Sequence, residues 1–502
     1  MTVSNGVGSD SAAPHPSSGG TRLDHGSMAD SAETLHILKD FPAVPTETWE
    51  KAIHVDLRGA DYTKKLVWNS DEGITVRPYY RREDLKDLES QMGAIPGTFP
   101  FVRGRGSQYW EQLESAGEVV ADAIRVDAIH EQGGTIVQEL GYGIALGVEK
   151  LVERLDGGGS VDEGAKGIRF VFAIGSNYFF DIAKLRAARM LWAGAVSAFR
   201  PRDESSCLMK LHACTALCNK SVYDSFANVL RATTEALAAV IGGCDSLEVR
   251  PFRFSDRLAM NIQRLLQEES HLDRVADPAG GSYYVEWLTD ALADQGWRLF
   301  QQVEQEGGYT KAKGSIDSAL AESRAARDKA VSSRRRTLVG VNNYPDLNET
   351  IGESVEVPQS IWRAASAFER LRLRTEAFTR ERGKRPKVLL LERGDLRMRQ
   401  ARSQFSQNFF GCAGFEIAIS QEFEQSDDAD LIVLCGSDPE YLALAQEVCP
   451  KVKQPVVVAG NPKAQFDQLR AAGVQGFIHI GTDAVTALTQ WQKRLGMGEG
   501  EK

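Results

Sequence analysis

Between residues 167 and 251 the chain alternates short apolar runs with longer stretches in which apolar side chains recur at helical spacing. The run at 168–174 is rich in β-branched and aromatic residues, as in a strand that is covered on both faces. Residues 178–198 carry apolar side chains three and four positions apart, which predicts an amphipathic helix. The succession continues with a strand at 207–212, a helix at 222–241 and a strand at 246–250. This pattern predicts parallel strands joined by helices.

Parallel strands of this kind place their functional loops at their carboxyl ends. Asn177, His212 and Pro251 each stand where a predicted strand ends. We therefore expect these three residues to share one rim of the sheet.

The first part of the chain has a different character. Residues 1–31 are rich in Ser, Gly, Asp and Pro and are expected to form a disordered tail. Residues 32–118 are expected to form an extended and helical segment with a role in subunit contact. It contains a helix from Glu47 and extended stretches at 66–68 and 74–76.

A loop is predicted at 95–106, where two prolines and three glycines exclude a helix or a central strand. Its arginines, Arg103 and Arg105, could meet an anionic ligand, and an ordinary solvated turn is an equal alternative.

With a strand at 121–128 and helices at 134–154 and 255–268, about four β/α units fall between residues 119 and 270. A closed (β/α)8 barrel needs twice that number, and four parallel strands alone would leave open edges. Either the earlier extended stretches or another chain must complete the structure, and we favour a partner chain. We expect a partial barrel domain at 119–306.

The second half of the chain begins with a long helix predicted at 283–303. A charged helix follows at 311–336, and its basic end, Arg334 to Arg336, is interpreted as a solvated face. Residues 307–385 are expected to form a helical linker belt. From Pro386 to residue 502, short apolar strands alternate with helices, which predicts a doubly wound, flavodoxin-like α/β domain.

Composition narrows the class of protein. The 502 residues carry a net charge of -10, which argues against nucleic acid as a partner. No apolar run reaches the length of a membrane span and no leader is recognisable, so we expect a cytoplasmic protein without membrane contact.

The seven cysteines suit a reducing compartment. Cys207, Cys214 and Cys218 flank His212 and could suggest a metal. Because a second pair with ligand spacing is missing from the sequence, small buried hydrophobic residues are the favoured interpretation.

Several stretches resemble the methylmalonyl-CoA mutase family of adenosylcobalamin-dependent isomerases. The resemblance covers most of the chain and rests on residues 73–85, 100–104, 175–189, 277–286 and 339–342. It implies a barrel that threads coenzyme A along its axis and a C-terminal Rossmann-like domain that carries cobalamin in catalytic members. Such members interconvert methylmalonyl-CoA and succinyl-CoA by a radical path that the cofactor supplies.

The departures from this family are informative. Catalytic members end the first strand of the C-terminal domain in Asp-x-His-x-x-Gly, whose histidine ligates cobalt. This chain has Gly394, Asp395, Leu396 and Arg397 in that region and no histidine there, so we expect no cofactor on this chain.

The run at 401–410 resembles the small, non-cobalamin subunit of the two-chain bacterial mutase. His479, on a different strand, is interpreted as a rim or core histidine.

Three residues are candidates for contact with substrate. His212 aligns with the histidine that contacts the acyl-thioester carbonyl in catalytic relatives, where an imidazole could stabilise developing oxygen charge. A histidine that only packs within the rim is the favoured alternative. Tyr79 and Arg103, both in stretches that carry the resemblance, are the candidate substrate-binding residues.

The favoured hypothesis is a mutase small subunit that supports a cobalamin-bearing large subunit in a heterodimer and is not catalytic alone. A self-sufficient acyl-CoA mutase with His212 at its active site is one alternative. A CoA-binding or chaperone-like protein of the mutase fold, which would bind a CoA thioester without turning it over, is another.

Overall fold

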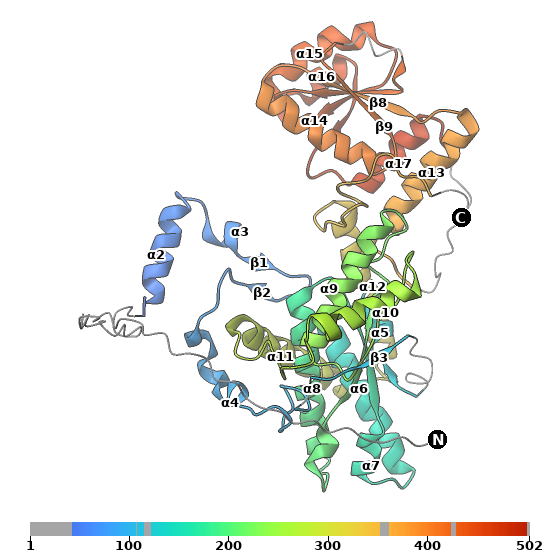
Figure 1. Ribbon diagram of the computed structural model, residues 1–502. Coiled ribbons are helices and arrows are strands. Elements are labelled where there is room, and N and C mark those ends of the chain that lie inside the picture. The colour runs from blue at the N-terminus through green and yellow to red at the C-terminus, as the bar shows by residue number, and fades with distance from the viewer. Residues whose placement is uncertain (1–42, 107, 115–121, 352–360, 423–427, 499–502) are drawn as a thin grey trace, which may run out of the picture. The chain divides into compact units, whose positions relative to one another are not determined.

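The structure of the protein is a computed structural model that describes residues 43–106, 108–114, 122–351, 361–422 and 428–498 (Figure 1). The predicted tail at 1–31 lies outside the described residues. The chain divides into two compact units, Met1–Val67 and Trp68–Lys502.

The described part of the first unit, residues 43–67, contains helices α2 (Thr46–Asp56) and α3 (Tyr62–Leu66). The Asp61 side chain caps α3 by accepting a hydrogen bond from the backbone N–H of Lys64 at 2.8 Å. No residue of α2 or α3 is buried. The helix predicted from Glu47 is thus present, whereas Leu66, predicted as extended, is the last residue of α3.

The second unit opens with an antiparallel pair of short strands, β1 (Trp68–Asn69) and β2 (Thr75–Val76). The turn between them uses Gly73 at a φ of 73°, a conformation that glycine adopts without steric cost. The 3-10 helix η1 (Arg82–Leu88) and helix α4 (Glu89–Met92) follow. The loop at 95–106 contains neither helix nor strand, as its prolines and glycines predict.

Five parallel strands form the first large sheet, in the order β3-β7-β6-β5-β4. Alternate residues of the central strand β5 face opposite ways, since Phe170, Phe172 and Ile174 enter the main core while Val171 and Ala173 enter a smaller cluster on the other face. The strands are β3 (Glu111–Leu113), β4 (Ile124–Arg125), β5 (Arg169–Ile174), β6 (Lys210–Thr215) and β7 (Ser246–Glu248).

Helices follow the strands of this sheet, and α6, α8 and α11 pack on one another over its main core. The helix α6 begins with a capping box between Thr135 and Gln138. Each of β4, β5, β6 and β7 is followed by a helix, so the four predicted β/α units are confirmed. The helical elements are α5 (Asp127–Glu131), α6 (Ile136–Asp156), α7 (Val161–Lys166), α8 (Tyr178–Ala198), η2 (Glu204–Cys207), α9 (Ser225–Ile241), α10 (Asp256–Arg264), the π-helical turn η3 (Leu265–Glu269), α11 (Tyr283–Gln305) and α12 (Lys313–Ser332).

The strand predicted at 207–212 is misplaced, because β6 runs from Lys210 to Thr215. The residues before it form the turn η2, in which the Asp203 side chain accepts from the N–H of Ser205. Ala213 and Cys214 lie beyond the predicted end of the strand but belong to β6, and the burial predicted for Cys214 is confirmed. His212 therefore lies inside the strand and not at its carboxyl end.

A second sheet of five parallel strands follows helix α13 (Ser366–Arg382), in the order β12-β11-β10-β8-β9. Val388 and Leu390 of β8 face one core and Leu389 and Leu391 face another, so helices cover both faces. The strands are β8 (Lys387–Glu392), β9 (Glu416–Ser420), β10 (Leu431–Cys435), β11 (Val456–Ala459) and β12 (Val474–Ile478). The helical elements are α14 (Leu396–Gly411), η5 (Asp438–Glu440), α15 (Tyr441–Val448), η6 (Cys449–Lys451), η7 (Lys463–Gln465), α16 (Phe466–Ala471) and α17 (Ala484–Arg494).

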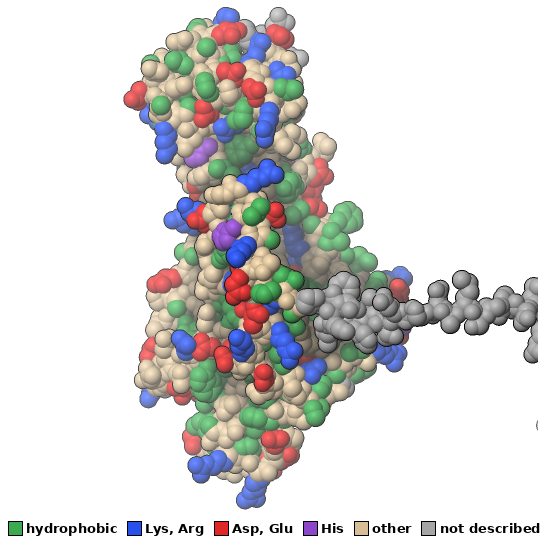
Figure 2. All heavy atoms as spheres, turned by 90° about the vertical axis from the view of Figure 1, so that its left-hand side faces the viewer, with side chains coloured by type: hydrophobic (Ala, Val, Ile, Leu, Met, Phe, Trp, Pro, Cys, Tyr) green, Lys and Arg blue, Asp and Glu red, His purple; other side chains and the backbone are tan. Residues whose placement is uncertain are grey.

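The surface carries mixed charge. Figure 2 shows cationic and anionic side chains interspersed over the face that it draws. Within the described ranges, none of the helices has both the length and the hydropathy needed to cross a bilayer.

Candidate functional site

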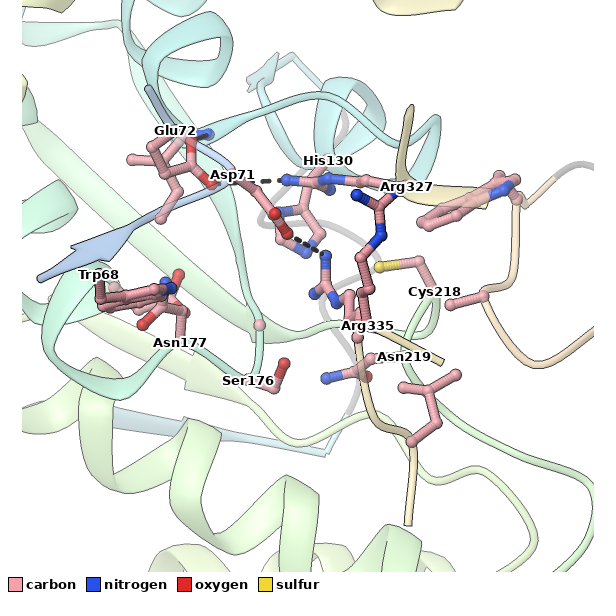
Figure 3. A pocket seen from close by; sticks show the side chains of 17 residues that line it. Trp68, Asp71, Glu72, His130, Ser176, Asn177, Cys218, Asn219, Arg327 and Arg335 are labelled. Carbon is pink, nitrogen blue, oxygen red and sulfur yellow. Dashed lines mark hydrogen bonds and ion pairs between the residues drawn. The ribbon is translucent and has the colours of Figure 1, made fainter. Parts of the chain in front are cut away.

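A pocket of about 330 Å³ lies at the carboxyl ends of β5 and β6 (Figure 3). Gly175, Ser176 and Asn177 follow β5, and Cys218 and Asn219 follow β6. The other walls come from the β1–β2 turn, from α5 and α12, and from the segment after α12. Their lining residues include Trp68, Asp71, Glu72, His130, Arg327, Arg335 and Arg336. The predicted position of Asn177 at this rim is confirmed.

Two ion pairs line the pocket. Arg336 Nη1 donates to Asp71 Oδ2 at 3.0 Å, and Arg327 Nη2 lies 3.5 Å from Glu72 Oε1. Burial raises the pKa of Glu72, although Arg327 opposes this shift. Glu72 also accepts a hydrogen bond from the N–H of Ile136 at the start of α6, which ties the β1–β2 turn to that helix.

The basic run Arg334 to Arg336, just after α12, was interpreted as a solvated face, and this is wrong for two of its three arginines. Arg334 and Arg336 are half-buried, and only Arg335 is exposed. Burial lowers the pKa of Arg336. The sequence could not reveal this role, because Asp71 stands 265 positions before its partner Arg336.

A buried network of charges begins in the wall of the pocket, where His130 and Asp181 lie, and continues inward to Glu139 and Lys184. His130 Nδ1 lies 2.7 Å from Glu139 Oε1, and Lys184 Nζ donates to Glu139 Oε2 at 2.9 Å. Lys184 Nζ also lies 2.8 Å from Asp181 Oδ1. Burial lowers the pKa of His130, but Glu139 and Cys218 together raise it well above its usual value. These groups therefore favour the protonated form of the imidazole between α5 and α6.

His212 lies apart from this pocket. Its Nδ1 lies 2.9 Å from Oγ of Ser246, and its Nε2 lies 3.9 Å from Oε2 of Glu248 on β7. The side chain is completely buried on β6, opposite Val171 of β5. His212 thus does not share the rim with Asn177, in contrast to the prediction.

Tyr79 and Arg103 also lie outside the lining of the pocket. Tyr79 is half-buried after β2. Arg103 Nε donates to Asp277 Oδ2 at 2.9 Å, and its Nη1 donates to the carbonyl of Ala94 at 3.0 Å. The structure therefore does not bring the three predicted substrate residues to one place, because Arg103 and His212 have separate sets of partners.

The carboxyl end of β8 in the second sheet corresponds to the place where the family motif would hold cobalt. The turn is short, because α14 already begins at Leu396 and the Asp395 side chain caps it by accepting from the N–H of Met398 at 2.9 Å. Gly394 has a φ of 78°, and a Cβ there would collide with the Glu440 carboxylate. Leu396 and Arg397 offer no cobalt ligand, so these residues do not fit a lower-ligand site for cobalamin.

His479 is the only histidine between residues 386 and 502, and it does not replace the missing ligand. His479 follows β12, and two strands, β11 and β10, lie between β12 and β8. The distance between β12 and β8 is therefore three strand spacings, roughly 14 Å in total. The Nδ1 of His479 accepts a hydrogen bond from the N–H of Gly481 at 3.0 Å.

A second cavity, of about 550 Å³, lies at the amino ends of β5 and β6. Arg105, Arg169 and Lys210 bring positive charge to its lining, and Glu111 and Asp245 bring negative charge. Arg105 Nε lies 3.3 Å from Asp245 Oδ1. The lining thus holds one more cation than anion. In the described part of the chain, no group of three or more His, Cys, Asp and Glu side chains is arranged to hold a metal ion.

Comparison with known proteins identifies the family of this chain. A family model for methylmalonyl-CoA mutase matches residues 114–384. The chain is 32% identical to a methylmalonyl-CoA mutase small subunit of Porphyromonas gingivalis over 625 aligned residues, which cover 94% of this chain and 100% of that protein. It is 34% identical to a small subunit of Streptomyces virginiae over 75% of this chain and 64% of that protein.

Similarity also extends to mutases without a subunit designation. The chain is 40% identical to a methylmalonyl-CoA mutase of Cereibacter sphaeroides over 44% of this chain and 33% of that protein. The alignment with the Porphyromonas protein is longer than the 502 residues of this chain, so that relative contains segments that this chain lacks.

Proposed function

Because the chain belongs to the methylmalonyl-CoA mutase family and is a small-subunit-like member of it, we propose that it supports a cobalamin-bearing large subunit in a heterodimer. The complex would interconvert methylmalonyl-CoA and succinyl-CoA with adenosylcobalamin held on the partner chain. The present chain would supply binding surface and stability to that complex and would not be catalytic alone.

The observation that carries this proposal is the closed turn between β8 and α14. Cobalt needs a nitrogen or similar donor below the corrin ring, and neither Leu396 nor Arg397 can supply one. The Glu440 carboxylate fills the space beside Gly394, and the early start of α14 shortens the turn to residues 393–395. Chemistry that depends on cobalamin would therefore take place on another polypeptide.

We further propose that the first sheet is the surviving part of a mutase (β/α)8 barrel at 119–306 and that residues 386–502 form a flavodoxin-like domain. Five parallel strands with open edges at β3 and β4 support the first assignment. Helices on both faces of the second sheet support the other. Residues 307–385 would connect the two as a linker belt.

The N-terminal segment is the favoured contact with the partner. An isolated helix of 11 residues is marginally stable in water, and most helices gain their stability by packing an apolar face. Val55 of α2 is 75% exposed and no residue of α2 is buried. A partner that covers Val55 would bury this apolar side chain.

Co-expression with a mutase large subunit tests the proposal directly. The expected result is a one-to-one complex by native mass measurement, with mutase activity that the large subunit alone lacks or loses faster. A matched pair of variants locates the contact, since Val55→Glu on α2 should weaken the complex while Val152→Glu on the exposed side of α6 should not. A stable monomer that never binds the large subunit would contradict the proposal.

Titration with adenosylcobalamin separates this proposal from a self-sufficient mutase. We expect the visible spectrum of the cofactor to stay unchanged when the chain is added alone. The Arg397→His variant should behave in the same way, because Glu440 and the start of α14 still close the turn. A saturable spectral change at one equivalent of chain would favour the self-sufficient enzyme.

A second candidate function is binding of a CoA thioester at the cavity between the amino ends of the strands. Its excess of positive charge from Arg105, Arg169 and Lys210 suits the phosphates of CoA. Retention on immobilised CoA, with loss in Lys210→Glu but not in the distant Lys313→Glu, would support this candidate. Passage of the chain through the column without retention would exclude it.

A further inference from the structure

Arg327 is a buried cation in the wall of the charged pocket, and its guanidinium lacks hydrogen-bond partners. The residue is only 7% exposed, and its Nε has no acceptor. Its Nη2 lies 3.5 Å from Oε1 of Glu72, which is longer than the usual hydrogen bond between an arginine and a carboxylate. The other carboxylate oxygen of Glu72 accepts from the N–H of Ile136. A buried guanidinium without acceptors among the described residues is costly, and it points to an acceptor that a ligand would bring.

Arg335 offers a second guanidinium to the same cavity. Its side chain is exposed, and its Nε donates to Oγ of Ser333 at 3.1 Å, which anchors the guanidinium at one corner. Within the described ranges, Nη1 and Nη2 of Arg335 donate to no acceptor of the protein. These groups belong to the planar fork with which an arginine holds both oxygens of a carboxylate.

The three carboxylates that line the pocket are each paired with a cation other than Arg335. Arg335 therefore has no counter-ion among the residues that the structure describes. One unbalanced positive charge suits a ligand with a single negative charge. The three pairs are Asp71 with Arg336 at 3.0 Å, Glu72 with Arg327 at 3.5 Å and Asp181 with Lys184 at 2.8 Å.

The rest of the lining combines polar and apolar groups. The side chains of Ser176 and Asn177 line the cavity at the carboxyl end of β5. In the view of Figure 3, Ser176 and Arg327 lie on opposite sides of Asp71. Trp362 and Leu338 add apolar walls, and the Trp362 ring is fixed because its Nε1 donates to Oδ1 of Asp328 at 2.9 Å. Cavities that bind small molecules have this composition, in which a few polar groups orient a mainly apolar ligand.

We propose that this pocket binds a small monocarboxylate with an apolar body. The carboxylate lies against the guanidinium groups of Arg335 and Arg327, and the body lies against Trp362 and Leu338. None of the predicted substrate residues lines this pocket, so the ligand is separate from the acyl-CoA chemistry proposed for the complex.

Isothermal titration of the full chain with sodium benzoate tests the proposal, since benzoate has one negative charge and a flat apolar body. We expect saturable binding of one benzoate per chain. Arg335→Gln should weaken this binding about tenfold, because it removes a charge-assisted pair. The exposed position of Arg335 allows its replacement without loss of the fold.

The matched control is Arg298→Gln, which removes an exposed cation of α11 that pairs with Asp294. This variant should bind benzoate as tightly as the native chain does. Absence of saturable binding to the native chain would overturn the proposal. Equal affinities of Arg335→Gln and the native chain would overturn it as well.

Two further ligands test the chemical class. Benzamide has the shape of benzoate without the charge, and inorganic phosphate has charge without an apolar body. Each should bind at least about tenfold more weakly than benzoate. Equal or tighter binding of either one would overturn the assignment to a monocarboxylate. All of these titrations use the chain without a mutase partner, so their failure would leave the proposed function in place.

Discussion

Nζ of Lys184 donates a hydrogen bond to Oε2 of Glu139 at 2.9 Å, and both side chains are completely buried between α8 and α6. The same ammonium donates to the carbonyl of Ala173 at 2.6 Å, near the end of β5. A single cation therefore links two helices to the strand that carries the rim of the pocket. Burial opposes its charge, but Asp181 and Glu139 together raise the pKa of Lys184.

Replacement of this cation should be costly. The Lys184→Met variant would leave Glu139 and Asp181 buried with one cation fewer, and we expect its free energy of unfolding to fall by about 3–5 kcal/mol. Urea denaturation measures the loss. Lys313→Met, which removes an exposed pair with Asp317 in α12, should cost about 0.5 kcal/mol or less. Equal losses in the two variants would show that the buried network does not stabilise the fold.

The charge of His130 should make stability depend on pH. Burial lowers the pKa of His130, but Glu139 and Cys218 together raise it above its value in the unfolded chain. The stabilisation is therefore fully present below the unfolded value of about 6.5 and is lost as pH rises through the folded value. The difference in unfolding free energy between the native chain and His130→Gln should be largest near pH 6 and shrink toward pH 9. A difference that grows with pH would contradict this sign.

Close packing around Gly147 should make any larger residue at this position destabilising. A Cβ at Gly147 in α6 would lie 2.5 Å from Cζ of Phe170 and 2.8 Å from Cζ3 of Trp192. Although alanine favours helices by about 1 kcal/mol, Gly147→Ala should lower stability by about 2 kcal/mol through overpacking. Gly194→Ala in α8 is the matched control, since nothing lies within 4 Å of its Cβ, and it should raise the thermal midpoint. A stabilised Gly147→Ala variant would disprove the packing described for α6.

His212 should act as a structural residue. Ser246→Ala removes the group that lies 2.9 Å from its Nδ1, and we expect a loss of about 1–2 kcal/mol in unfolding free energy. The turnover rate of the reconstituted complex, per folded heterodimer, should differ by no more than about twofold between His212→Gln and the native chain. The reason is that the His212 side chain is completely buried in the sheet. A hundredfold loss of turnover at unchanged stability would instead place His212 at the substrate.

The sequence predicted the central elements well, because strong periodicity and burial coincide there. The helix expected at 178–198 is observed at Tyr178–Ala198, and the strand at 168–174 is β5 within one residue. The edge strands β3 and β9 were missed. Glu111 and Gln112 carry no apolar alternation, and the strand character of β9 rests on Ile417 and Ile419 alone.

The pocket could not be predicted in the same way. Its walls come from segments far apart in sequence, so no local pattern unites Asp71 with Arg336 or Glu72 with Arg327. His212 was placed at a rim because the predicted strand at 207–212 ended there. Ala213 and Cys214 are instead packed inside the sheet, where their small size suits the close packing of a strand buried on both faces.

The turn between β8 and α14 has a further physiological consequence. Both cores of the C-terminal sheet are filled by side chains of the chain itself, and Glu440 and Asp395 satisfy the groups of the turn. A subunit that needs cobalamin to complete its fold is stabilised when cobalamin binds. Such a subunit becomes scarce when cobalamin is scarce. If cobalamin binds only to the partner chain, as proposed, adenosylcobalamin should leave the thermal midpoint of the isolated chain unchanged.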